Sequence, residues 1–393
     1  MKNCGIVCEY NPFHSGHKYQ IDEVRRHGFD NVICVMSGSF VQSAEPAFCD
    51  KSLRAECAIM GGTNAVIELP VLYATASAQF FAEGAIKILS GIKSLTHIAM
   101  GAVAKEEEIL RAADIKIKNC DKFNSLLKEY LAQGKSYNSA SNAALIKVYQ
   151  EHYPDKPSIE NIFTDPNNIL CIEYISAIEK YAPSIQPLII ERRGATYNDG
   201  EIHGEHISAT AIRIAEMRGQ LDSVKNYIPY NYDKIEKWRI EHSPDLSSYG
   251  KMLLFSIKSK TAKEISTLRN CSEGLEFLVK NSSVECNKDS FISAVIGKRY
   301  SKKRIMRLLL DSLLDINSKL LQNRFVTRLL ACSKSFDFSL LPNCVKTTNN
   351  DIKLASSDIE VAEVLKIDEN ATALYNTLCG IKGGYYNYSL VKL

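Results

Sequence analysis

The chain has 393 residues, of which 45% are hydrophobic and 24% are charged, and its formal net charge is +3. This length supports a large buried core and predicts two domains. The net charge is too small to indicate a nucleic-acid partner from composition alone. The 12 cysteines form no C-x-x-C pair, and we find neither a cationic leader with an apolar run nor a stretch of about 18 apolar residues. We therefore expect a reduced cytoplasmic protein with no membrane partner.

A first buried strand is predicted at 4–8, and it leads into a helix through Asn11-Pro-Phe-His14-Ser-Gly16-His17. Asn11-Pro12 ends the strand, and Gly16 allows a tight turn before a helix that begins near His17. Backbone N–H groups at such a helix start suit a triphosphate. Two imidazoles can also donate hydrogen bonds to phosphate oxygens as charge builds up in a transition state.

Two ordinary histidines are the alternative, and this is the favoured interpretation of an isolated H-x-x-H pattern. The first strand-to-helix turn of a parallel α/β unit is, however, where open sheets bind ligands. The position therefore favours His14 and His17 as catalytic residues of a nucleotide site. No P-loop and no G-x-G-x-x-G occurs, which argues against the corresponding phosphate cradles.

Strands and helices alternate along the first half of the chain. Further strands are predicted at 31–36, 65–69, 95–100 and 186–190, and helices at 17–26, 52–60 and 76–89. A helical insert, about 104–182, separates the last two strands, with helices at 105–112, 122–133, 138–152 and 168–181. The pattern predicts an α/β fold with a doubly wound, parallel, Rossmann-like sheet in a domain of residues 1–230.

A second motif, Ile207-Ser208-Ala209-Thr210-Ala211-Ile212-Arg213, offers two hydroxyls at a helix start and an arginine one turn later. Ser208 or Thr210 alone is better interpreted as a helix N-cap. His203, Glu205 and His206 precede this motif without a further ligand nearby, and we expect no metal site there.

Residues 231–393 are predicted to form a second, mainly α-helical domain. Helices are expected at 251–257, 262–267, 274–280 and 288–295, followed by an amphipathic helix from Ser301. Six cations surround Tyr300 at the start of that last helix: Lys298, Arg299, Lys302, Lys303, Arg304 and Arg307. Cations oppose the helix dipole there, so the cluster is either a solvated face or a binding site for a polyanion. The tail from Phe325 carries no signal for chemistry.

The two motifs together resemble those of the HIGH/nucleotidyltransferase superfamily. Further motifs, in order, are similar to those of one member, the bacterial tRNA-Met cytidine acetate ligase family. They are Met36-Ser-Gly-Ser-Phe-Val-Gln42, Glu45-Pro-Ala47, Asp50-Lys51 with Arg54-Ala-Glu56, Val66-Ile-Glu-Leu-Pro70, Ala78-Gln-Phe-Phe-Ala-Glu-Gly84, Pro166-Asn-Asn-Ile-Leu170, Glu173-Tyr174 and Arg192-x-Gly194-x-x-Tyr197. The resemblance implies a HUP-type nucleotidyltransferase domain, formation of acetyl-adenylate from acetate and ATP, and acetylation of N4 of the wobble cytidine of elongator tRNA-Met.

The resemblance also implies which residues contact ATP, and it makes the six cations near Tyr300 a tRNA-binding surface. Mg²⁺ is expected with the triphosphate, mostly hydrated. Lys18, Asp50 and Lys51 are candidates to assist acetyl transfer, the second step, but for that role the favoured interpretation is that they are solvated helix charges. The implied ATP contacts are Val7, Cys8, Glu9, Tyr10, Asn11, Pro12, Phe13, His14, Ser15, Gly16, His17, Lys18, Tyr19, Gln20, Gly101, Asn167, Arg192, Arg193, Ser208, Thr210 and Arg213.

The chain departs from the family pattern at four positions. Ser43-Ala44 stands where Arg-Gly is usual, and Ala102-Val103 stands where Ser-Glu is usual. These departures leave open a non-catalytic RNA-binding protein, although intact His14, His17 and Arg213 argue against it. The superfamily motifs alone would equally permit a small-molecule adenylyltransferase, which would leave the basic cluster unexplained.

Overall fold

The computed structural model describes residues 2–192, 207–272, 274–297 and 299–393. Its centre is a sheet in which five parallel strands follow the order β5-β4-β1-β2-β3. This order reverses between β1 and β4, as in doubly wound folds, and it confirms the predicted fold class. The strands are β1 (Asn3–Cys8), β2 (Asn31–Ser37), β3 (Ala65–Leu69), β4 (Leu95–Ala102) and β5 (Gln186–Glu191).

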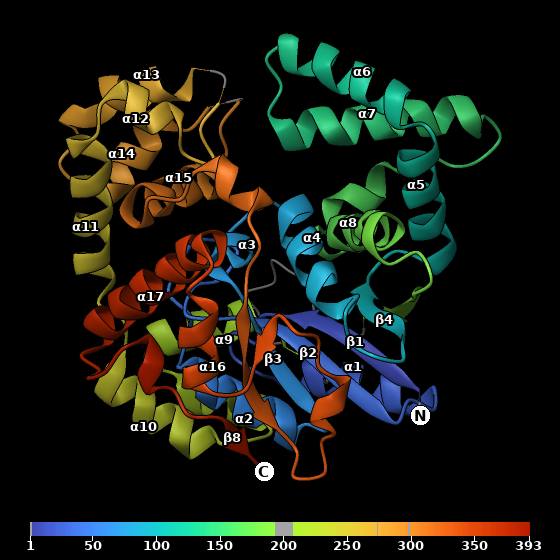
Figure 1. Ribbon diagram of the computed structural model, residues 1–393. Helices are drawn as coiled ribbons and strands as arrows, with labels where there is room; N and C mark the ends of the chain where they lie inside the picture. The colour runs from blue at the N-terminus through green and yellow to red at the C-terminus, as the bar shows by residue number, and fades with distance from the viewer. Residues whose placement is uncertain (1, 193–206, 273, 298) are drawn as a thin grey trace.

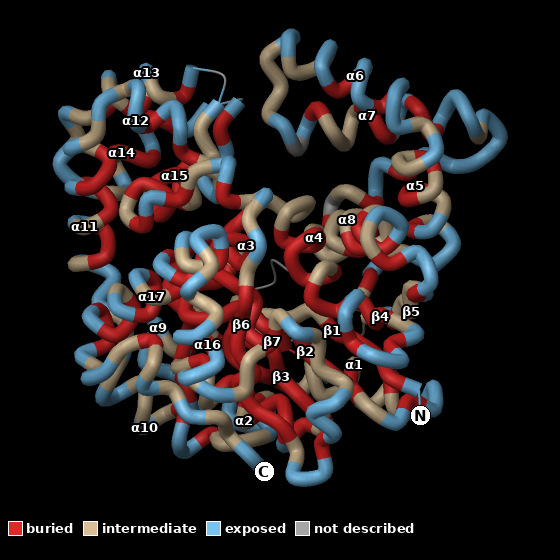
Figure 2. Tube along the Cα trace, viewed as in Figure 1, coloured by how far each residue is buried: buried red, intermediate tan, exposed pale blue. Residues whose placement is uncertain are grey.

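The central strands are buried on both faces, which is why they read as continuous apolar runs rather than alternating patterns. Figure 2 shows this buried centre surrounded by more exposed helices. The helices that connect the first four strands include one short helix that the sequence analysis did not predict, the one that follows Pro70. They are α1 (Ser15–Arg26), α2 (Lys51–Met60), α3 (Val71–Ala74) and α4 (Ala78–Leu89).

Four α-helices and one 3-10 helix occupy the predicted insert. The last of them, α8, packs against α4 and β4, whereas α6 and α7 pair with each other and project from the sheet (Figure 1). The segments are α5 (Glu106–Lys118), α6 (Cys120–Ala132), α7 (Tyr137–His152), η1 (Glu160–Thr164) and α8 (Pro166–Tyr181).

Helices predominate after β5 as predicted. In Figure 1, α12 to α15 form a lobe that stands opposite the α6–α7 pair, on the same side of the sheet. The segments are α9 (Ala209–Met217), η2 (Leu221–Tyr227), α10 (Tyr232–His242), α11 (Leu246–Ser259), α12 (Ala262–Ser266), α13 (Leu275–Asn281), η3 (Ser282–Val284), α14 (Lys288–Val295), α15 (Lys302–Leu314), η4 (Ser318–Gln322), η5 (Phe338–Leu340), α16 (Asn349–Ala355), α17 (Ile359–Cys379) and η6 (Tyr385–Asn387).

The tail also contains three strands that the sequence analysis did not predict. β6 (Thr327–Cys332) runs antiparallel to β3, and β7 (Val345–Lys346) and β8 (Val391–Lys392) pair with β6. All six residues of β6 are buried. Its partner strand lies far away in the sequence, so no local pattern identifies it. The end of the chain therefore extends the sheet that β1 to β5 form.

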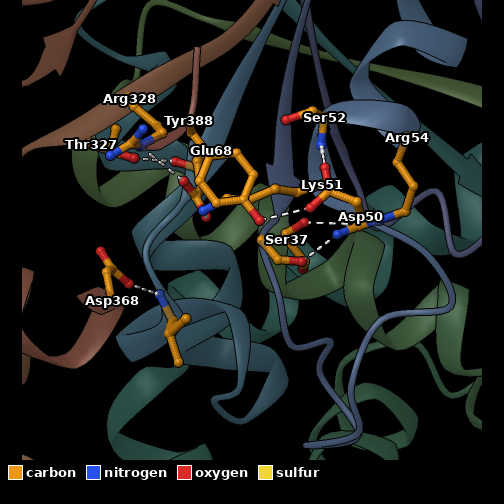
Figure 3. A network of polar contacts seen from close by, with 12 residues as sticks. Ser37, Asp50, Lys51, Ser52, Arg54, Glu68, Thr327, Arg328, Asp368 and Tyr388 are labelled. Carbon is orange, nitrogen blue, oxygen red and sulfur yellow. Dashed lines mark hydrogen bonds and ion pairs between the residues drawn. The ribbon is translucent and has the colours of Figure 1, made fainter. Parts of the chain in front are cut away.

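A buried polar network fixes this tail to strand β3 and to the start of α2 (Figure 3). The Lys51 ammonium lies 2.6 Å from one carboxylate oxygen of Glu68, and Arg328 of β6 lies 3.7 Å from the other. The Tyr388 hydroxyl donates to Asp50 at 2.7 Å, and its ring lies 4.4 Å from the Lys51 ammonium. The interpretation of Lys51 as a solvated helix charge is wrong, because its side chain is 1% exposed and is neutralised by Glu68.

Asp368 of α17 completes the network. One of its oxygens accepts the backbone N–H of Val71 at 2.8 Å. Burial, and then the nearby charge of Glu68, raise the pKa of Asp368 to about 7. This carboxyl therefore titrates near neutral pH at the junction between the tail and the sheet.

Candidate active site

A pocket opens at the carboxyl ends of β1 and β4, where the strand order reverses. Doubly wound folds bind their ligands in this crevice. Of the residues that the structure describes, it is lined by Val7, Cys8, Glu9, Tyr10, Asn11, His14, His17, Gln20, Gln42, Phe81, Met100, Gly101, Asn167, Leu170, Cys171, Tyr174, Arg192, Ser208, Ala209, Thr210 and Arg213.

His14 and His17 lie side by side at the start of α1. This helix begins two residues earlier than predicted. His14 is the N-cap, and its Nδ1 accepts the backbone N–H of Gly16 at 3.1 Å. Nδ1 of His17 accepts the backbone N–H of His14 at 3.3 Å. Since both Nδ1 atoms act as acceptors, we infer that the proton of each neutral ring resides on Nε2.

Burial is the main cause that lowers the pKa of His17 to about 3, and the charge of Arg192 lowers it further. His17 is therefore a neutral imidazole at physiological pH. A neutral ring still donates one hydrogen bond through Nε2. The arrangement thus supplies the kind of donor predicted from the sequence, without a positive charge on His17.

The helix start differs from the prediction in a second respect. The backbone N–H groups of His14 and Gly16 are bonded to the two imidazoles, so these two groups are engaged in the cap. A Cβ atom at position 16 would lie 3.0 Å from Cε1 of His14. Gly16 therefore leaves room for the imidazole that packs over its backbone.

The second motif faces the first across the pocket. Ser208 is the N-cap of α9 and accepts the backbone N–H of Ala211 at 3.1 Å. Arg213 donates to the backbone oxygen of Asn11 at 2.7 Å and to the Thr210 hydroxyl at 3.1 Å. These contacts hold the guanidinium beside the loop that carries the histidines.

A third group of polar residues stands at the edge of β4. Arg192 lies 3.5 Å from the amide oxygen of Asn167, whose amide nitrogen donates to Asp165 at 2.7 Å. A Cβ atom at Gly101 would lie 3.3 Å from Cγ of Arg192. The glycine therefore makes room for this arginine as well as for any ligand. Arg193 lies outside the described residues.

Glu9 is the acidic residue of the pocket lining. One of its oxygens accepts the backbone N–H of Gln42 at 2.7 Å. Burial raises the pKa of Glu9, and the charges of Arg213, Arg54 and Lys303 oppose that rise. Sequence reasoning missed Gln42 as a lining residue and Lys303 as a neighbour of Glu9, because only the tertiary fold brings them here.

Six residues predicted to contact ATP lie outside the pocket lining. Gly16 supports the His14 ring, Phe13 is buried with its ring centroid 5.7 Å from that of His17, and Lys18 pairs with Asp22 in the next turn. Their assigned contacts with the nucleotide remain predictions. The six are Pro12, Phe13, Ser15, Gly16, Lys18 and Tyr19.

The usual glycine of the family pattern at position 44 is an alanine here, in a left-handed conformation with φ of 61°. Such a conformation favours glycine because it crowds Cβ. The residue is fully buried, and its carbonyl accepts the Tyr249 hydroxyl at 2.6 Å. The substitution therefore costs local strain but leaves the loop that carries Gln42 anchored.

The predicted tRNA-binding cations do not form one uniform surface. Lys302 and Lys303 are exposed at the start of α15, where Ser301 caps the helix. Arg304 donates to the Asn270 carbonyl at 3.3 Å, and Arg307 donates to the Gln42 carbonyl at 2.9 Å. Arg299 lines a second pocket, and Lys298 lies outside the described residues.

No metal-binding group of three or more His, Cys, Asp or Glu side chains is present among the described residues. His203, Glu205 and His206 lie outside them. None of the helices in the described ranges is long and apolar enough to cross a bilayer.

The chain matches the family model of the HIGH nucleotidyl transferases over residues 1–384. It is 34% identical to the tRNA(Met) cytidine acetate ligase of Caldanaerobacter subterraneus subsp. tengcongensis, over 100% of this chain and 98% of that protein. Its identity to the protein of the same name from Clostridium perfringens is 31%, over 96% of each chain.

Two crystal structures of Thermotoga maritima TmcAL superimpose on the whole chain. The apo form gives a TM-score of 0.89 at 28% identity, and the form bound with alpha-thio ATP gives 0.87 at 27%. Both alignments cover 100% of each chain.

Proposed function

Because this chain belongs to the tRNA(Met) cytidine acetate ligases within the HIGH nucleotidyl transferases, we propose that it activates acetate with ATP and acetylates N4 of the wobble cytidine of elongator tRNA-Met. The observation that carries the proposal is the pair of histidines whose Nδ1 atoms are both bonded to backbone N–H groups. This arrangement sets two Nε2–H donors at the start of α1, beside a pocket that would take the nucleotide.

In the first step, an acetate oxygen attacks the α-phosphorus of ATP, and the bond to the β-phosphate oxygen breaks. Acetyl-adenylate and pyrophosphate are the products. His14 and His17 donate to the phosphate oxygens as negative charge accumulates, which is the kind of preorganised stabilisation that lowers the barrier most. Arg213 and Arg192 contribute positive charge from opposite sides of the pocket, and Asn167 orients Arg192.

Mg²⁺ would accompany the triphosphate in this step. Glu9 is the carboxylate of the pocket lining, and it faces Arg213 and Lys303. This donor set suits a metal that is bound mainly by phosphate oxygens and water. The ion would neutralise phosphate charge, while the side chains named above position the α-phosphate.

In the second step, the N4 amine of cytidine attacks the acetyl carbon of the adenylate. The bond from that carbon to the AMP oxygen breaks, AMP leaves, and the amine releases one proton to solvent water. This step needs the anticodon loop at the mouth of the pocket. Lys302 and Lys303 at the start of α15 are exposed for contacts with its phosphates, and Lys303 also faces Glu9.

The proposal is tested by incubating the protein with acetate, ATP and a transcript of elongator tRNA-Met, then analysing the nucleosides by mass spectrometry. We expect N4-acetylcytidine at the wobble position, formed only when acetate and ATP are both present. A His17→Ala variant is the negative control. Adenylylation of a small molecule without any change in the tRNA would favour the adenylyltransferase alternative, and tRNA binding without either reaction would favour the non-catalytic one.

A further inference from the structure

A second pocket, of about 330 Å³, lies between the helical insert, the start of α4 and the start of α15. Figure 1 shows the α6–α7 pair and the α12–α15 lobe standing on opposite sides above α4. The volume lies near the lower end of the range for small-ligand sites, about 300 to 1,000 Å³. The pocket is lined by Ser77, Gln79, Phe80, Ser136, Tyr137, Arg269, Asn270, Ser272, Arg299, Ser301, Arg304 and Arg307.

Three arginines, Arg299, Arg304 and Arg307, bring positive charge to this lining, and none of the lining residues named above carries a carboxylate. The fourth arginine, Arg269, adds little, because its side chain is 2% exposed and is paired with the fully buried Asp311. An anion is therefore the ligand that this surface attracts.

The start of α4 adds to this preference. Ser77 is the N-cap of this 12-residue helix, but its side chain makes no capping hydrogen bond. Ser77, Gln79 and Phe80 all line the pocket, so the positive end of the helix dipole faces the same space as the arginines. A phosphate is the anion that suits such a helix start together with guanidinium groups.

Two aromatic rings distinguish the pocket from a simple phosphate site. Phe80 is half-buried, whereas Tyr137 is 40% exposed and its hydroxyl lies 3.5 Å from the amide oxygen of Gln79. Aromatic rings beside cations are the usual means by which proteins hold single-stranded RNA, with the base stacked on a ring and the backbone on the charges.

The second pocket adjoins the candidate active site. Arg307 lines the second pocket and donates to the carbonyl of Gln42, which lines the first. Phe80 and Phe81 are consecutive residues of α4, and they line the second and first pockets respectively. A chain of single-stranded RNA with one residue at the first pocket would therefore have a neighbouring residue near the second.

We propose that the second pocket binds the tRNA nucleotide adjacent to the acetylated cytidine, with its base stacked on Tyr137 and its phosphate held by Arg299 and Arg304. This inference rests on the proposed function. A nucleotide bound in the second pocket would hold the RNA so that the cytidine amine points toward the adenylate. The inference also gives the α6–α7 pair, which carries Tyr137, a role in substrate recognition.

The test uses an anticodon stem-loop RNA and two variants of one residue. Tyr137→Ala removes the ring, whereas Tyr137→Phe keeps it and removes only the hydroxyl. Affinity is measured by fluorescence anisotropy for the intact RNA and for RNAs with an abasic site on either side of the wobble cytidine. We expect Tyr137→Ala to weaken binding of the intact RNA about tenfold, a typical effect of losing one stacked base, and Tyr137→Phe to bind like the parent.

One of the abasic RNAs should bind the parent about tenfold more weakly than the intact RNA binds it. The same abasic RNA and the intact RNA should bind Tyr137→Ala with equal affinity, because the ring and the base act as one unit. Arg299→Ala gives an independent readout, a decrease of about 0.7 in the dependence of log affinity on log salt. The inference would be overturned if Tyr137→Ala and the parent bound every RNA with equal affinity. It would also be overturned if Tyr137→Ala lost binding of a free mononucleotide but kept its affinity for RNA.

Failure of this inference is distinguishable from failure of the proposed function. Tyr137 lies outside the first pocket, so acetate-dependent exchange between ATP and pyrophosphate should be equal in the parent and both variants. If the parent acetylates tRNA and Tyr137→Ala binds and acetylates it equally well, only the role of the second pocket is refuted. A parent without exchange or acetylation refutes the proposed function, whatever the variants do.

Discussion

His17 accepts the backbone N–H of His14 at its Nδ1, and the two rings lie with centroids 3.7 Å apart at an angle of 31°. The same pair therefore caps the helix and would supply the two phosphate donors that we propose. Each ring is held by a backbone contact, which sets its position and its tautomer in the absence of a ligand. Helix capping and transition-state stabilisation can be separated by suitable substitutions.

The His14→Asn variant should retain the cap and lose the imidazole donor. Asparagine is a preferred N-cap, so thermal melting should change little, while acetate-dependent exchange should fall about 100-fold, the usual cost of removing one oxyanion donor. His14→Ala should lose the same activity and also about 1 kcal/mol of stability. Full exchange activity in His14→Asn would restrict His14 to a structural role.

The Arg213→Ala variant should weaken ATP binding or turnover without changing tRNA affinity, because its guanidinium is held at the Asn11 carbonyl inside the first pocket. Arg218→Ala is the matched control, since it is an exposed arginine just beyond the same helix. Binding of a nucleotide analogue and of tRNA should be measured separately by calorimetry. A loss confined to tRNA would place Arg213 outside the nucleotide site.

Lys302 and Lys303 should differ although both are exposed cations on α15. Replacing either with alanine should weaken tRNA binding and reduce the salt dependence of log affinity by about 0.7 to 0.9 for each phosphate that the protein no longer neutralises. Only Lys303→Ala should also shift the pH–rate profile of the exchange reaction. Its acidic limb should move to higher pH, because the charge of Lys303 lowers the pKa of Glu9. Identical pH profiles for the two variants would argue against this link.

Asp368→Asn should stabilise the protein at alkaline pH. The folded pKa of Asp368 is about 7, above the ordinary value of about 3.9, so its contribution to stability is lost as pH rises between these two values. Asparagine can still accept the Val71 N–H without the buried charge. At pH 8 the variant should gain on the order of 1 kcal/mol or more, since one pKa unit corresponds to about 1.4 kcal/mol.

Denaturant unfolding at pH 5 and pH 8 measures this effect. The difference between Asp368→Asn and the parent should be much smaller at pH 5, where the parent carboxyl is mostly protonated. A variant that is less stable than the parent at pH 8 would mean that the charged carboxylate stabilises the junction through Lys51 and Arg328.

The sequence predicted those elements whose signals are local. Strand β3 was predicted at its observed bounds, because four of its five residues are apolar and Pro70 follows it directly. The N-cap alternative for Ser208 is what the structure shows. The motif at His14 likewise identified the strand-to-helix turn that lines the pocket.

The remaining features depend on partners that are distant in sequence. Strand β6 exists because it pairs with β3, and Lys51 is buried because Glu68 and Arg328 reach it from other elements. The division of the basic cluster also escaped prediction. Arg307 is bound to Gln42, and its neighbour Lys303 faces Glu9, neither of which is close in sequence.

Isotopic exchange between pyrophosphate and ATP decides whether the first pocket activates acetate as its adenylate. The exchange is measured with acetate, with longer carboxylates and with phosphorylated cofactor precursors, all in the absence of tRNA. We predict exchange that requires acetate and that falls about 100-fold or more in His17→Ala. Exchange with a cofactor precursor but not with acetate, or equal exchange in His17→Ala and the parent, would contradict the account.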